Sequence, residues 1–277
     1  MLELLQYDFF TNALLAALLS SVSCGIIGTY IVSRRMVFIG GGITHASFGG
    51  IGIAYYLGMN PIVGAAVFAV LSALGINYFS QNGNIRQDSS IAIWWSLGMA
   101  IGIVFIAITP GYSPNLMSFL FGSILTVTFA DLAYMAVLSV ILVILFSFFF
   151  RVIVMIAFDE EFARARNLPV SFFNYTLMAL MALVIVASIR ISGVILVLSL
   201  LTLPQATANL FTKDFRSIMV ASVFIGLIGM LAGLYISYYT DLPSGATIIL
   251  LLTALFLVGK LFLTAKGLLY RRSQNSV

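Results

Sequence analysis

The sequence predicts an all-α protein: a polytopic membrane helical bundle with about eight transmembrane helices, a short outer or re-entrant helix and a short cytoplasmic helix. Of its 277 residues, 62% are hydrophobic and 8% are charged, whereas soluble domains carry about 25% charged residues. The mean hydropathy is +1.14. Apolar runs such as ILVILFSFFF do not alternate in polarity, so they indicate membrane helices and not the strands of a β-barrel.

A helix needs roughly 20 apolar residues to cross the hydrocarbon layer, and the chain contains nine apolar segments near that length. They are residues 10–33, 37–58, 61–79, 90–109, 131–150, 171–190, 193–210, 216–239 and 244–265. The polar breaks between them leave no room for an aqueous domain, so we expect one transmembrane domain over residues 1–277. Counting 193–210 as one crossing, we expect about eight crossings, with the N-terminus outside and the C-terminus cytoplasmic.

The first span follows the segment MLELLQYDFF, which carries Glu3 and Asp8 but no basic residue. A secretory signal peptide would begin with positive charge, so we expect this span to be retained. It contains Cys24, the single cysteine, which has no partner for an internal disulfide and is interpreted as a packing residue. Arg34 and Arg35 follow directly and place the next loop in the cytoplasm.

Alternating from that loop, the basic residues fall on one side of the membrane. The cytoplasmic set is Arg86, Arg151, Arg164, Arg166, Lys213, Arg216, Lys266, Arg271 and Arg272, and Arg190 alone falls outside. The net charge of +4 is therefore a topology signal and does not indicate a nucleic-acid partner. This assignment requires that residues 113–124 do not cross the membrane, and we expect a short outer or re-entrant helix there.

The second span contains GGGITHASFGG, residues 40–50, with the only histidine of the chain, His45. In a helix, the residues three, four and seven positions away share one face with it. They include Gly41, Gly42, Phe48, Gly49 and Gly52. Such a bare stripe either allows another helix to approach closely or leaves an open lumen beside the ring.

His45 lies about eight residues, or roughly 12 Å, from the cytoplasmic end of its span. An ionisable side chain at that depth indicates a functional site, and imidazole is a good ligand for zinc or iron. One histidine cannot complete a tetrahedral zinc site, but two copies about a two-fold axis could place two rings on one pathway. The alternative is a neutral histidine hydrogen-bonded across a helix interface. The pathway-lining candidates here are Gly41, Thr44, Ser47 and Gly49.

The stretch FDEEFARARNLPV, residues 158–170, predicts a short cytoplasmic helix over about 159–168. Asp159 is suited to an N-cap, acidic residues follow in the first turn, Arg164 and Arg166 lie in the last, and Pro169 stops the helix. Such a helix either docks a cytoplasmic partner or is an ordinary juxtamembrane helix. The docking candidates are Asp159, Glu160, Glu161, Phe162, Ala163, Arg164 and Arg166.

Two later stretches combine proline with polar residues. In SGVILVLSLLTLPQATANL, Pro204 interrupts an apolar run, which predicts either a broken, cavity-lining helix or a simple kink. Pro204, Gln205 and Thr207 are further pathway-lining candidates. In DLPSGATIILL, capping by Asp241 or Ser244 is sufficient to explain the start of the last span. Asp241, Ser244 and Arg190 are kept as outer-gate or capping candidates.

Taken together and in order, these stretches resemble the permease subunit of the bacterial ATP-binding-cassette importers for zinc, manganese or iron. The resemblance covers about residues 10–265. It is carried by SRRMVFIGGGITHASFGGIGIAYYLG, DSSIAIWWSLGMAIGIV, FLFGSILTVTFADL, FDEEFARARNLPV, IRISGVILVLSLLTLPQATA and DLPSGATIILL.

The resemblance implies a homodimer of permeases in the bacterial plasma (inner) membrane that encloses one pathway through the lipid. It further implies two cytoplasmic ATPase subunits and an extracytoplasmic solute-binding protein that delivers the metal. The helix at 159–168 corresponds to the coupling helix, His45 to the pathway histidine, and Pro204 with Ala206-Thr207-Ala208 to a PxATA element. No cofactor is expected to stay bound, and the divalent metal, zinc or manganese, is cargo.

One position departs from the family pattern, which commonly has an acidic residue four positions before the histidine. This chain has Gly41 there. The missing carboxylate removes a hard oxygen ligand, which favours imidazole-dominated, zinc-like selectivity.

The chain is expected to be a transport subunit and not an enzyme. It contains no GxxxxGK[ST] phosphate loop, so ATP hydrolysis is expected on a separate chain. The alternative is an ion-gradient-driven carrier or channel that uses His45 as a ligand or proton relay. Metal uptake by such a carrier would continue after ATP depletion and would stop when a proton uncoupler is added.

Overall fold

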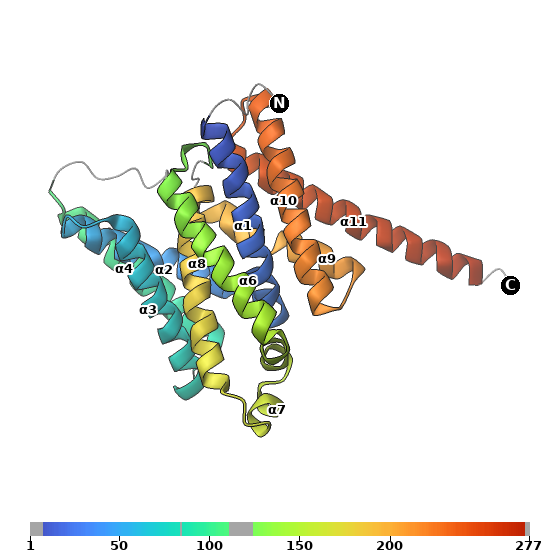
Figure 1. Cartoon of the computed structure of the whole chain (residues 1–277), viewed down its shortest axis with the longest axis horizontal. Helices are drawn as coiled ribbons and strands as arrows, with labels where there is room; N and C mark the ends of the chain where they lie inside the picture. The colour runs from blue at the N-terminus through green and yellow to red at the C-terminus, as the bar shows by residue number, and fades with distance from the viewer. Residues whose placement is uncertain (1–7, 84, 111–123, 275–277) are drawn as a thin grey trace.

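The chain folds as a bundle of helices (Figure 1). The computed structural model describes residues 8–83, 85–110 and 124–274, and no strand occurs in these ranges. The elements are α1 (Asp8–Ser33), α2 (Val37–Tyr56), α3 (Pro61–Asn82), α4 (Gln87–Ile108), η2 (Ile124–Thr126), α6 (Phe129–Phe158), α7 (Glu160–Ala165), α8 (Val170–Leu200), α9 (Leu203–Phe211), α10 (Phe215–Thr240) and α11 (Ser244–Gln274). Among the described residues, eight helical segments are long and apolar enough to cross a membrane, so the predicted polytopic helical bundle is confirmed.

Two ion pairs mark the opposite ends of this bundle. At the end of α1, Arg34 pairs with Glu160 of α7 at 3.0 Å, and we call this the α7 end. At the start of α6, Asp131 pairs with Arg190 of α8 at 3.3 Å, and we call this the Asp131 end. α1, α6 and α8 run side by side between the two ends (Figure 1).

The chain reverses direction inside α8, where the sequence predicted two separate apolar segments. Gly193 has φ 75° and ψ 164°, a conformation that glycine adopts far more easily than other residues. Arg190 lies at the Asp131 end, whereas Leu198 and Leu201 reach Gly40 in the first turn of α2. The candidate span Val170–Phe211 therefore holds two segments that run in opposite directions, so the eight candidate spans comprise nine segments.

A second break separates α8 from α9 at Leu201 and Thr202. Pro204 lies in the first turn of α9, where its missing N–H is not needed for a helical hydrogen bond. Gln205 is fully buried, and its side-chain amide donates to the carbonyl oxygens of Leu200 at 3.2 Å and Cys24 at 2.9 Å. The predicted break in this helix is present, and the hydrogen bond from Gln205 to Cys24 connects the broken region to α1.

The ends of two predicted elements lie elsewhere than expected. α6 continues to Phe158, well past residue 150, with a kink at Phe149, because the sequence stays apolar on both sides of Arg151. Asp241 has φ 53° and ends α10 rather than starting α11. The predicted outer helix at 113–124 lies outside the described residues, except Ile124, which begins η2.

Glycine contacts hold α2 between α3 and α4. Gly50 of α2 faces Gly64 of α3 so closely that a Cβ on either would collide with the backbone of the other. Gly49 and Gly52 meet α4 in the same way. Without a hydrophobic effect between helices in lipid, close backbone approach is a main source of association. Most of the bare stripe around His45 therefore serves helix packing.

We predict that Gly98→Ala in α4 destabilises the protein by about 1–3 kcal/mol, the usual cost of overpacking. A Cβ at Gly98 would lie 2.5 Å from the Cα and carbonyl oxygen of Ala46, which are backbone atoms that cannot rotate away. Thermal unfolding in detergent measures the effect. The matched control is Gly40→Ala, whose Cβ would meet Leu201 and Leu198 at ordinary distances of 3.5 and 3.6 Å. Equal destabilisation by both changes would contradict this interpretation.

Candidate functional site

His45 lies in the middle of α2 and is half-buried. Its ring stacks flat on the indole of Trp95 of α4, with centroids 4.4 Å apart and an interplanar angle of 5°. Neither ring nitrogen has a hydrogen-bond partner among the described residues. The sequence-based alternative of a histidine hydrogen-bonded across a helix interface is therefore not what this chain shows. One ring face is covered and the ring edge keeps both nitrogens free.

Gly41, one helical turn before His45, lies beside the same indole. A Cβ there would be 3.7 Å from Cζ3 of Trp95 and 3.8 Å from Cδ2 of Leu198, which are ordinary contact distances. Gly42 differs, because a Cβ there would collide with Ile91. Packing thus requires glycine at position 42 but leaves room at position 41.

The other predicted pathway residues lie in packed surroundings. Thr44 and Ser47 are buried, and their hydroxyls donate to the carbonyl oxygens of Gly40 at 2.7 Å and Thr44 at 2.6 Å. Gly49 packs against Gly98 of α4. On α9, the Thr207 hydroxyl donates to the carbonyl oxygen of Leu203 at 2.7 Å. Among the candidates, Gly41 is the one that the structure brings to the His45–Trp95 pair.

A single chain does not offer a complete metal site in its described part. No group of three or more histidine, cysteine, aspartate or glutamate side chains gathers there. Cys24 is buried beside Ser188, with 3.6 Å between sulfur and hydroxyl oxygen. A metal ion at His45 would need further ligands from water or from another molecule. Trp95 is 37% exposed and His45 is half-buried, so this pair is not sealed inside a single chain.

The second candidate site is α7, which is shorter than the predicted 159–168. Asp159 caps it by accepting the Phe162 N–H at 2.9 Å. Glu160 pairs with Arg164 one turn later at 2.7 Å. The helix ends at Ala165, and Asn167 takes a left-handed conformation with φ 57°. The N-cap and the acidic-to-basic order along the helix agree with the sequence-based expectation.

Arg34 joins α7 to two long helices, and sequence reasoning treated it only as a topology signal. Its guanidinium donates to Glu160 at 3.0 Å, to the Asn174 side-chain oxygen of α8 at 3.2 Å and to the Tyr30 hydroxyl at 3.3 Å. Only the spatial arrangement brings these side chains together, because Glu160 is 126 positions away from Arg34.

Partial burial of Glu160 raises its pKa, but hydrogen bonds from Arg164 and Arg34 and the charge of Arg34 outweigh this and hold the pKa below its usual value. Because the pKa is lowered on folding, the ionised carboxylate stabilises the folded state at pH values above the unfolded-state pKa. That contribution is lost as the pH falls through the lowered folded-state pKa. The attachment of α7 is therefore intact at neutral pH.

The outer surface of α7 carries aromatic and basic groups. Phe162 is 45% exposed, and the Arg166 guanidinium lies over its ring, 5.0 Å from the centroid. Phe158, just before α7, is exposed too. Ala163 faces inward and is fully buried. An exposed aromatic ring with basic neighbours on a firmly anchored helix is suited to docking a partner protein.

At the Asp131 end, the predicted gate or capping residues have distinct positions. Arg190 is held by Asp131, which also forms a capping box with Thr128 at the start of α6. Asp241 is exposed in the turn after α10. Ser244 is the first residue of α11, and the carbonyl oxygen before it, on Pro243, accepts the Thr247 N–H at 3.1 Å.

Comparison with known proteins shows similarity over almost the whole chain. Residues 6–263 match the model of the ABC 3 transport family. An uncharacterized membrane protein of Synechocystis sp. is 42% identical over 95% of this chain and 93% of its own length. The manganese transport system membrane protein MntC of Listeria monocytogenes is 35% identical over 99% of this chain and 98% of its own length. In the structure of PsaBC from Streptococcus pneumoniae in complex with Fab, a chain superposes with a TM-score of 0.81 at 33% identity, covering 92% of each chain.

We predict that Arg34→Gln lowers stability by about 1–3 kcal/mol, because it removes the donor to Asn174 and one of the two arginine partners of the half-buried Glu160, which keeps only Arg164. It should also speed amide hydrogen exchange in residues 160–165. The matched control is Arg86→Gln, which breaks a pair with Asp88 at 3.1 Å whose side chains are 84% and 61% exposed. That change should cost about 0–1 kcal/mol. Unaltered exchange in α7 after Arg34→Gln would show that the network does not anchor this helix.

Proposed function

Because the chain belongs to the ABC 3 transport family, we propose that it is the permease subunit of an ATP-driven importer of divalent transition metal ions. The observation that carries this proposal is the lone histidine of a membrane helix, whose ring nitrogens bond to no residue in the described ranges and one of whose ring faces is covered by Trp95. A buried, hydrogen-bonded histidine would indicate packing. A half-buried ring with free nitrogens is suited to contact a passing ion.

In this proposal two copies of the chain form a homodimer and face one pathway in a bacterial plasma membrane. One imidazole from each copy, completed by water, gives a weak site, and weak sites suit transport because the ion must also leave. Trp95 acts as a positioning residue, because the stacked indole fixes the plane of the His45 ring. Gly41 leaves space beside the ring for water.

Manganese is the first candidate for the cargo, and zinc is the second. The Listeria relative is named for manganese transport, and its similarity extends over nearly all of this chain. The ligand that this chain offers favours zinc instead, because an imidazole without a nearby carboxylate suits zinc better than manganese. The sequence alone favoured zinc, so a direct competition among metals is needed.

The α7 end is proposed to face the cytoplasm, where most basic residues of the loops gather. If each of the nine segments crosses the membrane once, the N-terminus lies outside and the C-terminus inside, because an odd number of crossings puts the two ends on opposite sides. A separate ATPase subunit docks on α7, with Phe162, Arg164 and Arg166 as the exposed contact residues. A solute-binding protein delivers metal at the Asp131 end.

We expect metal uptake only from the complete assembly. Vesicles containing this chain alone should show no uptake. Vesicles that contain this chain together with the cognate ATPase, ATP and the binding protein should accumulate radioactive manganese. Competition with unlabelled zinc and iron then ranks the cargo. Uptake that persists without ATP and stops with a proton uncoupler would instead identify an ion-gradient-driven carrier.

We predict that His45→Ala lowers metal uptake about tenfold or more, in line with the loss of a metal-site group. The protein should still accumulate and co-purify with the ATPase, because the glycine contacts of α2 remain. The control is Ile53→Ala, a truncation at another half-buried position of α2, which should leave uptake nearly unchanged. If His45→Ala abolishes accumulation of the protein, the ring has a packing role.

A further inference from the structure

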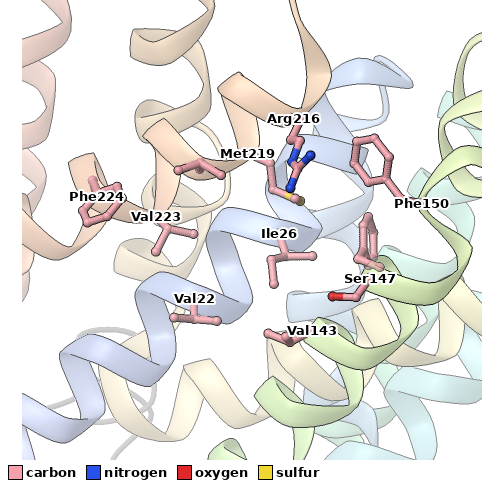
Figure 2. A pocket seen from close by; sticks show the side chains of 11 residues that line it. Val22, Ile26, Val143, Ser147, Phe150, Arg216, Met219, Val223 and Phe224 are labelled. Carbon is pink, nitrogen blue, oxygen red and sulfur yellow. The ribbon is translucent and has the colours of Figure 1, made fainter.

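A groove of about 440 Å³ lies between α1, α6 and α10, away from the His45–Trp95 pair. Its floor is formed by Val22 and Ile26 of α1, and its rims carry Val143 of α6 and Val220 and Phe224 of α10. Figure 2 shows these three helices around the groove. The volume falls within the roughly 300–1,000 Å³ of typical ligand pockets.

The helix contacts explain why the groove stays open. α1 packs against both α6 and α10, and α10 touches α1 closely where Val223 faces Gly25. α6 and α10 meet each other at the α7 end, where the ring of Phe215 stacks edge-on with Phe150 at 5.9 Å and Phe158 at 6.2 Å. Elsewhere each of the two helices packs on α1 and they do not pack closely on each other. The rim residues Val143, Val220 and Phe224 are all more than 40% exposed.

Two polar groups interrupt this apolar lining. Arg216, in the first turn of α10, points its guanidinium into the groove between Phe150 and Met219 (Figure 2). None of the four ion pairs formed by the described residues includes Arg216. The carboxylate of Asp214, close by in sequence, already accepts the N–H and hydroxyl of Ser217, both at 2.8 Å. Ser147 directs its hydroxyl into the same groove.

The apolar walls together with Arg216 favour one class of ligand. A groove on the outside of transmembrane helices opens toward lipid tails, and its apolar walls fit an acyl chain. An arginine near the helix end, without a carboxylate partner, is suited to a phosphate group, which it can bind with two parallel hydrogen bonds. Basic pockets between transmembrane helices are typical sites for anionic lipid head groups.

We propose that this groove is a binding site for an anionic phospholipid. The acyl chain lies along Val22, Ile26 and Val143, the head-group phosphate contacts Arg216, and Ser147 donates to an ester oxygen. A lipid held in this way bridges α6 and α10 where they do not touch each other. The site is independent of the metal pathway.

The test measures lipid retention on the full-length chain in detergent by native mass spectrometry. The probes are phosphatidylglycerol and phosphatidylcholine with identical acyl chains. The wild-type chain should retain one phosphatidylglycerol more tightly than phosphatidylcholine. Arg216→Gln should lower phosphatidylglycerol affinity about fivefold, the effect of one basic residue near an anionic lipid. Arg35→Gln, the same charge change at an exposed residue of the same end, should leave it unaltered.

A second pair of variants tests the acyl-chain contact. Val143→Phe fills the groove and should abolish retention of both lipids, whereas Val137→Phe places the same side chain on another exposed position of α6 and should not. Equal retention of both lipids by the wild type, an equal loss in Arg35→Gln, or full binding by Val143→Phe would overturn the proposal. So would displacement of the lipid by inorganic phosphate alone, which would indicate a simple anion site. A change of oligomeric state in Val143→Phe without loss of lipid would indicate that a second copy of the chain fills the groove.

Discussion

Backbone contact between α2 and its two neighbours is the constraint on which the candidate metal site depends. Gly98 of α4 lies against the backbone of Ala46, the residue next to His45. A helix held this closely can neither rotate nor slide without collisions, so the direction in which His45 leaves α2 is fixed. The same proximity brings the Trp95 indole of α4 flat onto the imidazole. In lipid, where apolar side chains gain little from association, such contacts replace the hydrophobic core of a soluble protein.

A second set of contacts ties the ends of the bundle to its middle through α1. At the α7 end, Arg34 connects this helix to α7 and α8. Farther along, the carbonyl oxygen of Cys24 accepts the buried Gln205 amide and thereby holds α9. A displacement of α7 must therefore either break the Arg34 network or move the end of α1 with it. In the proposed importer, this arrangement gives an ATPase docked on α7 a direct mechanical connection to the helices around the pathway.

The sequence predicted the helices well, because apolar length alone decides which segments can cross a membrane. It also predicted α7, since the N-cap Asp159 and the order of charges act locally. The sequence also separated residues 171–190 from 193–210, and the structure breaks α8 between them at Gly193, although the apolar pattern could not show that this glycine takes a positive φ. Trp95 and Arg34 were not recognised as site residues, since their partners lie on other helices. Thr44, Ser47 and Gln205 were chosen for polarity, but their side chains bind backbone carbonyls.

The stacking of His45 on Trp95 limits how an ion could bind to this chain. A metal ion binds imidazole in the ring plane through a nitrogen lone pair, so the covered face is no obstacle and the free edge is what matters. Manganese prefers oxygen ligands, and the position where a carboxylate would lie on the same face is Gly41. On the proposed function, the oxygen ligands must then come from water or from the second copy. Fewer charged ligands bind the ion less tightly, so a pathway built on this pair favours release over retention.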